Sequence, residues 1–256
     1  MAFDAGPEFP VSGSEPPPHV DLSRPTPVER VLAILEVLIC SDYPTQLALG
    51  TTFTALGFGP TRDGNLSLMF VVLVSLADTL LLLALIVALL RLRGESPREL
   101  LFGQRPILGE ARAGLSLALG ALLLGVVILV AIQAVVPSLH DVETNPLQTL
   151  IRTRRDAILF GLVVVLAGGV REEVQRAFLL RRFERWLGGG VVGIIVTSVL
   201  FGAGHRLQGV DGAVATGVPG AFWGIVYLRR RSVVAPVVSH AGFNLLQLAQ
   251  FLTLAR

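Results

Sequence analysis

The chain has 256 residues, of which 52% are hydrophobic and only 16% are charged. Because about a quarter of the residues of a soluble domain are charged, this composition excludes one or two soluble domains. It favours an all-α fold, a polytopic bundle of transmembrane helices. The formal net charge of +2 argues against the clustered basic surface that a nucleic-acid-binding protein needs. The single cysteine, Cys40, excludes an internal disulfide.

Composition divides the chain into three parts. Residues 1–27 are rich in Pro, Gly, Ser and acidic side chains, so we expect a disordered tail. They lack the basic and then apolar pattern of a signal peptide. We expect N-terminal membrane helices in residues 28–150 and a second membrane region, which carries the polar motifs, in residues 151–256.

About seven membrane helices are predicted, because a spanning helix needs about 20 mostly apolar residues. They are expected at residues 28–58, 66–90, 113–136, 156–186, 191–205, 213–228 and 233–254. Pro44 is expected to kink or break the first of them. The segment 91–112 is expected to form a loop with a short interfacial helix.

Arginine positions predict the orientation of the helices. The arginine-rich segments 91–112, 181–185 and 229–231 all lie inside if the N-terminus is cytoplasmic, and the acidic loop around Asp141 then lies outside. The arginines at 152–155 are the exception to this topology. We expect an integral protein of a bacterial plasma membrane with a cytoplasmic N-terminus.

Three polar groups of residues stand out in the last third of the chain. They are Glu172-Glu173 with Arg176, Phe201-x-x-x-His205, and His240-x-x-x-Asn244. With a hairpin at residues 186–190, a rise of 1.5 Å per residue puts Glu172 and His205 at the same depth, ~21 and ~22 Å from it. His240 is only ~14 Å from Arg231, so it is expected to be shallower unless its helix tilts or starts deeper.

These residue types allow two related reactions. Two imidazoles and a carboxylate can bind Zn²⁺ with an open water position. Alternatively, the carboxylate can act as a general base on water while the histidines and Asn244 hold the oxyanion. Taken singly, His205 is more often an interfacial residue, His240 a core histidine and Glu172–Arg176 a structural ion pair. Together, in a chain with four histidines, they favour a hydrolytic site.

The order of the motifs resembles the CPBP family of CAAX proteases and bacteriocin-processing membrane proteins. That family has Glu-Glu-x-x-x-Arg, Phe-x-x-x-His and His-x-x-x-Asn on successive membrane helices. Residues 201–205 (FGAGH) and 240–244 (HAGFN) match the second and third motifs. Residues 176–180 (RAFLL) resemble the Arg-Gly-Phe-Leu-Leu of the family. The resemblance extends over roughly residues 156–254.

The first motif departs from the family pattern. The family glutamates lie five and four positions before the arginine, whereas Glu172 and Glu173 lie four and three positions before Arg176. Arg171 therefore occupies the position of the first glutamate. Three explanations are open: Glu172 reaches the site from the second position, the helix has a local π-bulge or overwinding, or catalysis is impaired.

The resemblance implies an intramembrane metallo- or glutamic endopeptidase that acts on membrane-embedded or lipid-anchored peptides. Glu172 would activate water, with His205 and His240 as metal or oxyanion ligands. Glu173 and Asn244 would complete the catalytic set, and Arg176 and Phe201 would have supporting roles. Zn²⁺ is the cofactor to expect if the mechanism is not metal-free, and the bilayer and a peptide substrate are the expected partners. No nucleotide is expected, because no glycine-rich phosphate loop opens a helix.

The alternative is a catalytically impaired relative that acts as a membrane-embedded binding partner or chaperone, which the shifted first motif favours. A transporter is less favoured, because no inverted repeat or matched pair of broken helices is evident.

Overall fold

The structure, a computed structural model, describes residues 25–254 and is almost entirely helical, which confirms the all-α prediction. The α-helices are α1 (Pro27–Ile39), α2 (Tyr43–Ala55), α3 (Leu68–Leu92), α4 (Pro97–Phe102), α5 (Ile107–Val135), α6 (Arg154–Val163), α7 (Glu172–Trp186), α8 (Gly190–Gly204), α9 (Val210–Arg230) and α10 (Val234–Leu254). The π-helix η3 (Val164–Arg171) joins α6 to α7. Short elements are the strands β1 (Thr61–Arg62) and β2 (Asn65–Leu66) and the 3₁₀ turns η1 (Pro137–Leu139), η2 (Pro146–Leu150) and η4 (Arg206–Gln208).

The first described helix starts at a complete capping motif. Thr26 and Glu29 form a capping box, and Pro27 takes the first helical position, which it suits because its φ is already helical. Helix α1 therefore begins at the last residue of the expected tail, one residue before the expected start of the first membrane helix. Residues 1–24 of the predicted disordered tail lie outside the described residues.

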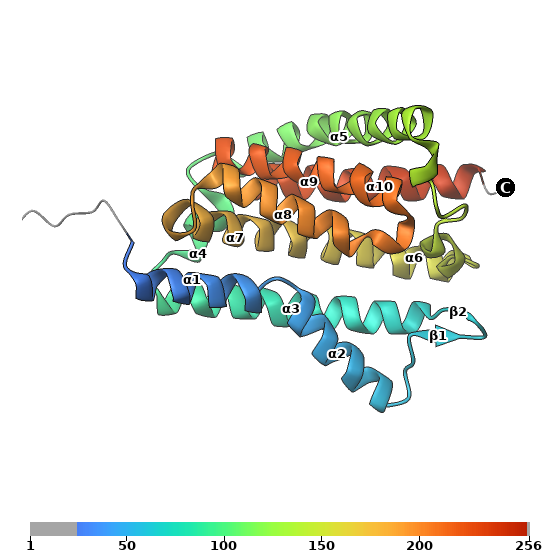
Figure 1. The fold of residues 1–256 in the computed structure, drawn as a ribbon, viewed down its shortest axis with the longest axis horizontal. Coiled ribbons are helices and arrows are strands. Elements are labelled where there is room, and N and C mark those ends of the chain that lie inside the picture. Colours follow the sequence, from blue (N-terminus) through green and yellow to red (C-terminus); the bar gives the residue numbers. More distant parts are fainter. Residues whose placement is uncertain (1–24, 255–256) are drawn as a thin grey trace, which may run out of the picture.

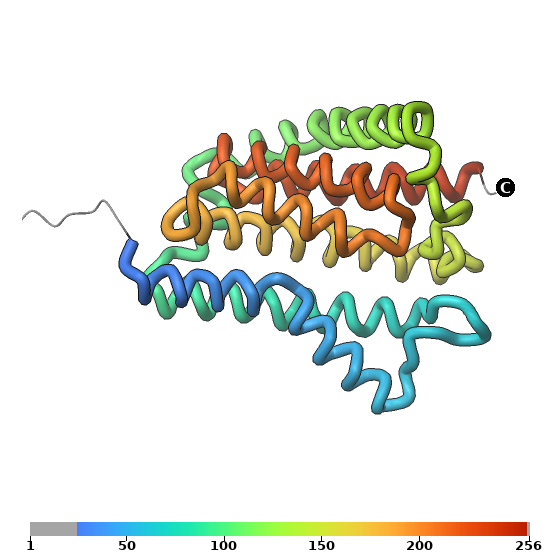
Figure 2. Tube along the Cα trace, viewed as in Figure 1, coloured from blue at the N-terminus to red at the C-terminus, as the bar shows by residue number. Residues whose placement is uncertain are grey.

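The first apolar segment is broken, as predicted, near Pro44. Helix α1 ends at Ile39, and α2 begins at Tyr43 with Pro44 in its first turn. Between them, Asp42 adopts a φ of +77°, a left-handed conformation that Asp tolerates better than most residues. Helix α2 consequently points away from the bundle before the chain turns back through the β1–β2 hairpin (Figure 2).

Helix α10 packs against η3 and α9 of the second region and against α5 of the N-terminal part, and so connects the two parts of the chain. Helix α5 covers α9 and α10 along one side of the bundle, while α1 and α3 lie on the opposite side, next to α7 (Figure 1). Helix α8 packs between α7 and α9. This arrangement places α7 between α1 and α3 on one side and the last three helices, α8 to α10, on the other.

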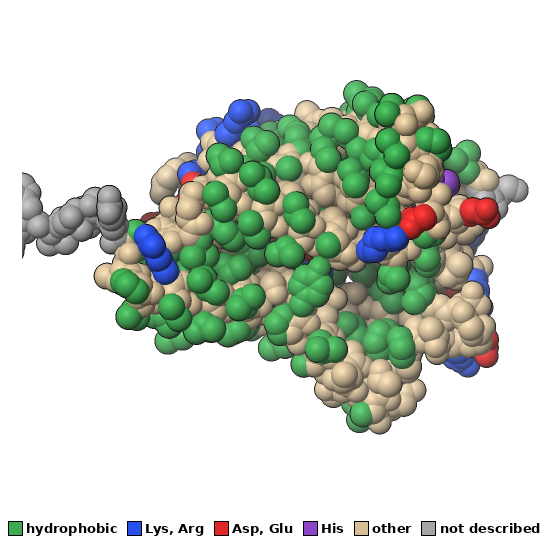
Figure 3. All heavy atoms as spheres, in the orientation of Figure 1, with side chains coloured by type: hydrophobic (Ala, Val, Ile, Leu, Met, Phe, Trp, Pro, Cys, Tyr) green, Lys and Arg blue, Asp and Glu red, His purple; other side chains and the backbone are tan. Residues whose placement is uncertain are grey.

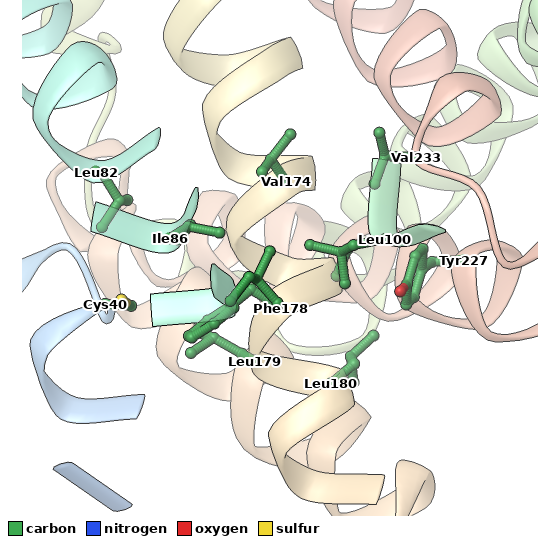
Figure 4. Close-up of a cluster of buried hydrophobic side chains, with 12 residues drawn as sticks. Cys40, Leu82, Ile86, Leu100, Val174, Phe178, Leu179, Leu180, Tyr227 and Val233 are labelled. Atoms are coloured by element: carbon green, nitrogen blue, oxygen red, sulfur yellow. The ribbon is translucent and has the colours of Figure 1, made fainter. Parts of the chain in front are cut away.

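Helix α7 is the centre of the largest apolar cluster, although it carries many charged side chains. Phe178 and Leu180 are fully buried against residues from α3, α4 and α9 (Figure 4). The equally buried Arg182 is neutralised by Glu36 and Glu95 and lies over the Phe178 ring. Helix α7 lies inside the bundle rather than on its surface, and the pairing of its charged side chains makes this burial possible.

The arginine-rich segments meet at one end of the bundle, as the topology requires. Arg181 pairs with Glu95 near α4, Arg230 pairs with Glu110 at the start of α5, and Arg231 pairs with Glu184. The link between α5 and α6, which contains Asp141, lies at the opposite end (Figure 1).

Three helical stretches among the described residues are long and apolar enough to cross a membrane. They are Pro27–Ala55, Leu68–Leu92 and Ile107–Val135, and Gly190–Gly204 is a shorter apolar helix. Hydrophobic side chains cover much of the face shown in Figure 3. The later helices carry the polar motifs, which lowers their hydropathy, so the count of about seven spans stays a prediction.

Candidate active site

A cavity of about 140 Å³ lies between the α1–α2 link and the helices α7 and α8. Four of the residues predicted from the sequence line it, namely Glu172, Arg176, Phe201 and His205. Figure 3 shows this face hollowed beside α2. Glu172 and His205 therefore reach one cavity, as the count of residues from the α7–α8 hairpin predicted.

The π-helix precedes Glu172 directly and packs closely on α10. A Cβ at Gly169 would lie 2.7 Å from the Cβ of Ala241, so only glycine allows this approach. A π-helix has a wider turn than an α-helix, and it occurs often at functional sites. Two of the three explanations for the shifted motif therefore agree with the structure. The helix is distorted into a π-helix before Glu172, and the side chain of Glu172 reaches the cavity.

The carboxylate of Glu172 lies between two basic groups. Its side chain is 14% exposed, with Oε1 3.2 Å from Arg171 Nη2. Its other oxygen, Oε2, is 3.9 Å from His240 Nε2, which is longer than a direct hydrogen bond. Glu172 thus presents a partly free carboxylate to the cavity.

Glu173 has different surroundings. Its side chain is only 1% exposed, and its Oε1 lies 2.7 Å from His240 Nδ1 and contacts Arg176 Nη1. Because the same oxygen contacts both groups, Glu173 connects the ring of His240 to the guanidinium of Arg176. The two adjacent glutamates are therefore unequal.

His240 reaches the glutamates, although the count from Arg231 suggested a shallower position. The reason is that Arg231 pairs with Glu184, so it lies level with a residue inside α7 and not with the end of that helix. Eleven residues separate Glu184 from Glu173 and nine separate Arg231 from His240, a difference of only about 3 Å.

Trp223 is a site residue that the sequence did not single out. Its ring stacks on His240 with centroids 3.8 Å apart and planes 16° apart, and its Nε1 donates to Ser239 Oγ. The Trp223 side chain is 1% exposed, so it forms one fixed wall for the imidazole. No motif signals this role, because a lone Trp in an apolar helix is usually a packing residue.

His205 is held by its own motif. Its Nδ1 lies 2.8 Å from the carbonyl oxygen of Phe201, and because a carbonyl only accepts, Nδ1 carries the proton. The Nε2 atom is left for water, substrate or metal. The Phe201 ring lies 4.7 Å from the imidazole and also under the guanidinium of Arg176, so the second motif is anchored to the first.

Asn244 contacts the π-helix. Its Nδ2 donates to the carbonyl oxygen of Val164 over 3.1 Å, and a Cβ at Gly168 would lie 2.5 Å from the same nitrogen. The structure thus places Asn244 one turn beyond His240, where it fixes the backbone of the helix that leads to Glu172.

Two acidic residues from the N-terminal helices complete the charged cluster. Asp78, fully buried on α3, and Asp42 both pair with Arg171. The sequence did signal Asp78, because it is the only charge in its apolar segment and charges at membrane depth usually mark function. Their meeting with Arg171 could not be predicted, because it depends on how α2 and α3 pack.

The residues fit zinc in donor type, since imidazole and carboxylate are common zinc ligands. Within residues 25–254, however, no three His, Cys, Asp or Glu side chains are gathered so as to hold a metal ion. The Nδ1 atoms of His205 and His240 are engaged by Phe201 and Glu173, which leaves their Nε2 atoms as donors. Zinc binding therefore stays a prediction.

Comparison with protein families gives a match to the second membrane region. The family described as type II CAAX prenyl endopeptidase Rce1-like matches residues 154–246. Residues 154–246 are thus similar to the Rce1-like family. The resemblance to CAAX proteases is thereby confirmed, and the matched segment contains every motif residue predicted from the sequence. Comparison with curated proteins and with solved structures gave no match.

The Rce1-like segment begins at the first residue of α6 and ends inside α10, so it leaves α1 to α5 outside. Together with the apolar helices of that N-terminal part, it identifies an integral membrane protein. The family implies a protease whose peptide substrate lies in the membrane.

Proposed function

We propose that the protein is an intramembrane endopeptidase that hydrolyses a peptide bond of a membrane-embedded or lipid-anchored substrate. The observation that carries this proposal is that Glu172 and His205 line one cavity beside His240. A carboxylate and an imidazole that line space for water, with a second imidazole beside the carboxylate, are groups that carbonyl hydrolysis can use.

In this reaction Glu172 takes a proton from water as the oxygen attacks the carbonyl carbon. The peptide C–N bond then breaks, and the amine leaves with that proton. The Nε2 atom of His205 is placed to orient the water, since its Nδ1 is engaged by Phe201. The Nε2 atom of His240 faces Glu172 and is placed to contact the carbonyl oxygen of the substrate.

The supporting residues act on these groups. Glu173 holds His240 and Arg176, and Asn244 holds the π-helix before Glu172. If zinc binds, Glu172, His205 and His240 are the residues that would hold it, and the metal would supply a Lewis acid. The arginine-rich end of the bundle is proposed to face the cytoplasm.

Cleavage of membrane-tethered peptides by the purified full chain tests the proposal. The panel pairs each peptide with and without a prenyl anchor. We expect cleavage by the wild type and a loss of roughly 100-fold or more in Glu172→Gln and His205→Ala. Glu110→Gln is the matched control, because it also changes a buried carboxylate paired with an arginine, but in the first turn of α5.

Absence of cleavage by the wild type across the panel, or full activity in both site variants, would disprove the protease proposal. Metal content of the same active samples separates the two mechanisms. About one zinc per chain that is lost in His205→Ala supports the metalloprotease, and activity without bound metal supports the glutamic mechanism.

A second candidate is a non-catalytic relative that binds peptide ends. It is favoured by Arg171, which stands where the family has its first glutamate and which pairs with Glu172. Binding of the panel peptides without cleavage, unaffected by Glu172→Gln, is the result that would select it.

A further inference from the structure

Arg171 is the residue by which this chain departs from the motif, and it is buried in a cluster of acids. Its side chain is 6% exposed. Its Nη1 lies 2.6 Å from Asp78 Oδ2, and its Nη2 lies 2.9 Å from Asp42 Oδ2 and 3.2 Å from Glu172 Oε1. One guanidinium thus connects three carboxylates.

Two of these acids come from outside the Rce1-like segment. Asp78 is fully buried on α3, and Asp42 lies in the α1–α2 link. The conformation of Asp42, with φ at +77°, is held by contacts that its carboxylate makes with Gln46 and Arg171. An uncommon backbone conformation persists only where the surroundings fix it, so the link is shaped around Arg171.

The cluster is not explained by stability alone. Removing charges from water is costly, and a buried ion pair often adds no net stability over apolar packing. Here three acidic side chains share one basic side chain inside the bundle. Ionisable groups kept at such a cost inside a membrane protein usually serve its function.

The geometry of Glu172 shows what Arg171 does. One carboxylate oxygen contacts Arg171, and the other faces His240 Nε2 at 3.9 Å. The orientation of the Glu172 carboxylate is defined by its neighbours at these two oxygens, and Arg171 is one of the two neighbours. Because Asp78 holds the other end of the guanidinium, the position of Arg171 is set by α3.

We propose that Arg171 is a positioning residue for Glu172, and that Asp78 and Asp42 hold Arg171 in place. The N-terminal helices are then part of the hydrolytic apparatus rather than a membrane anchor alone. This inference rests on the proposed endopeptidase function. It accounts for an arginine at the position of a family glutamate, since the planar guanidinium can join several carboxylates at once.

The test measures kcat and KM on a peptide that the wild type cleaves. Arg171→Gln and Asp78→Asn are expected to lower kcat by about 10- to 100-fold, because a small misplacement of a reacting group has an effect of that size. KM is expected to change by less than about 3-fold, since neither side chain is proposed to bind substrate. Arg171→Lys is expected to recover part of the lost kcat, because lysine keeps the positive charge but lacks the planar guanidinium that contacts several carboxylates at once.

Coupling distinguishes this role from simple destabilisation. The double variant Arg171→Gln/Asp78→Asn is expected to be no slower than Arg171→Gln, because Asp78 acts only through Arg171. Glu110→Gln, a buried acid outside the site, is the control and is expected to keep the wild-type kcat. If Asp78→Asn does not fold, Asp42→Asn replaces it, since the Asp42 side chain is 17% exposed.

The outcomes separate this inference from the function on which it rests. Loss of activity in Glu172→Gln with normal kcat in Arg171→Gln overturns the inference and leaves the protease proposal standing. Effects of Arg171→Gln and Asp78→Asn that multiply in the double variant also overturn it. A wild type that cleaves nothing, or a fully active Glu172→Gln, overturns both.

Discussion

Glu173 and His240, which are 67 residues apart in sequence, lie in direct contact, with the glutamate oxygen Oε1 2.7 Å from the imidazole Nδ1. The same oxygen contacts Arg176. The contact joins α7 to α10 and sets which nitrogen of His240 faces Glu172.

Substitution of Glu173 separates stability from activity. Glu173→Ala leaves the buried Arg176 without its carboxylate, and breaking such a pair costs about 3–5 kcal/mol. In Glu173→Leu/Arg176→Met both charges are absent, so we expect part of this stability to return, because apolar side chains often replace a buried pair without loss. Activity is expected to stay low, since His240 still lacks its partner. Thermal unfolding and peptide cleavage measure the two effects, and recovery of both together would contradict the role of Glu173 in holding His240.

Trp223 provides the second support of His240. Trp223→Ala removes a ring that is 1% exposed, and a truncation of this size costs about 3–5 kcal/mol. Trp223→Phe keeps an aromatic face over the imidazole, so we expect it to retain most of the stability and more of the kcat. Phe222→Ala, which truncates the half-buried neighbour of Trp223, is the control. Equal loss of kcat in Trp223→Phe and Trp223→Ala would show that stacking is not what the site needs.

Close packing of the π-helix on α10 is testable at one glycine. Gly169→Ala would bring a Cβ to 2.7 Å from that of Ala241 and within 3.3 Å of its backbone. Overpacking of this kind costs about 1–3 kcal/mol, and we expect lower activity as well, because α10 carries His240. Gly120→Ala is the matched control, since a Cβ there meets open space among the described residues. That change is expected to be neutral or to stabilise by up to about 1 kcal/mol. Equal unfolding temperatures for the two variants would disprove the close contact.

Asp141 fastens the α5–α6 link to the start of α9. Its carboxylate accepts from the Val210 N–H at 2.8 Å and pairs with Arg206. The Val210 hydrogen bond, followed by Arg206, holds the pKa of Asp141 below its ordinary value. A pKa that is lower in the folded than in the unfolded protein stabilises the folded protein. This stabilisation is complete at pH values above the unfolded pKa of about 3.9, and it is lost as the pH falls through the folded pKa.

Thermal unfolding of wild type and Asp141→Asn checks this pH dependence. We expect the wild type to be the more stable at neutral pH and the difference to shrink below about pH 4. A difference that stays constant into acid would mean that the charge of Asp141 is not responsible.

The sequence by itself predicted the features that depend on local geometry. Hydropathy predicted where the helices of residues 28–254 lie and the break near Pro44. The three motifs predicted the family of residues 154–246. The depth match of Glu172 and His205 followed from the constant rise of two helices that share one hairpin, for which no packing information is needed.

The tertiary structure decided the features that depend on contacts between distant segments. The contact of His240 with Glu173 shows that the two residues lie at the same level, and residue counting along the chain contains no such contact. The different surroundings of Glu172 and Glu173 follow from the π-helix and from how α10 packs on it. The pairing of Arg171 with Asp42 and Asp78 joins residues 93 and more positions apart. Their charges meet only because α3 packs against η3 and α7 and because α1, which leads to Asp42, packs against α7.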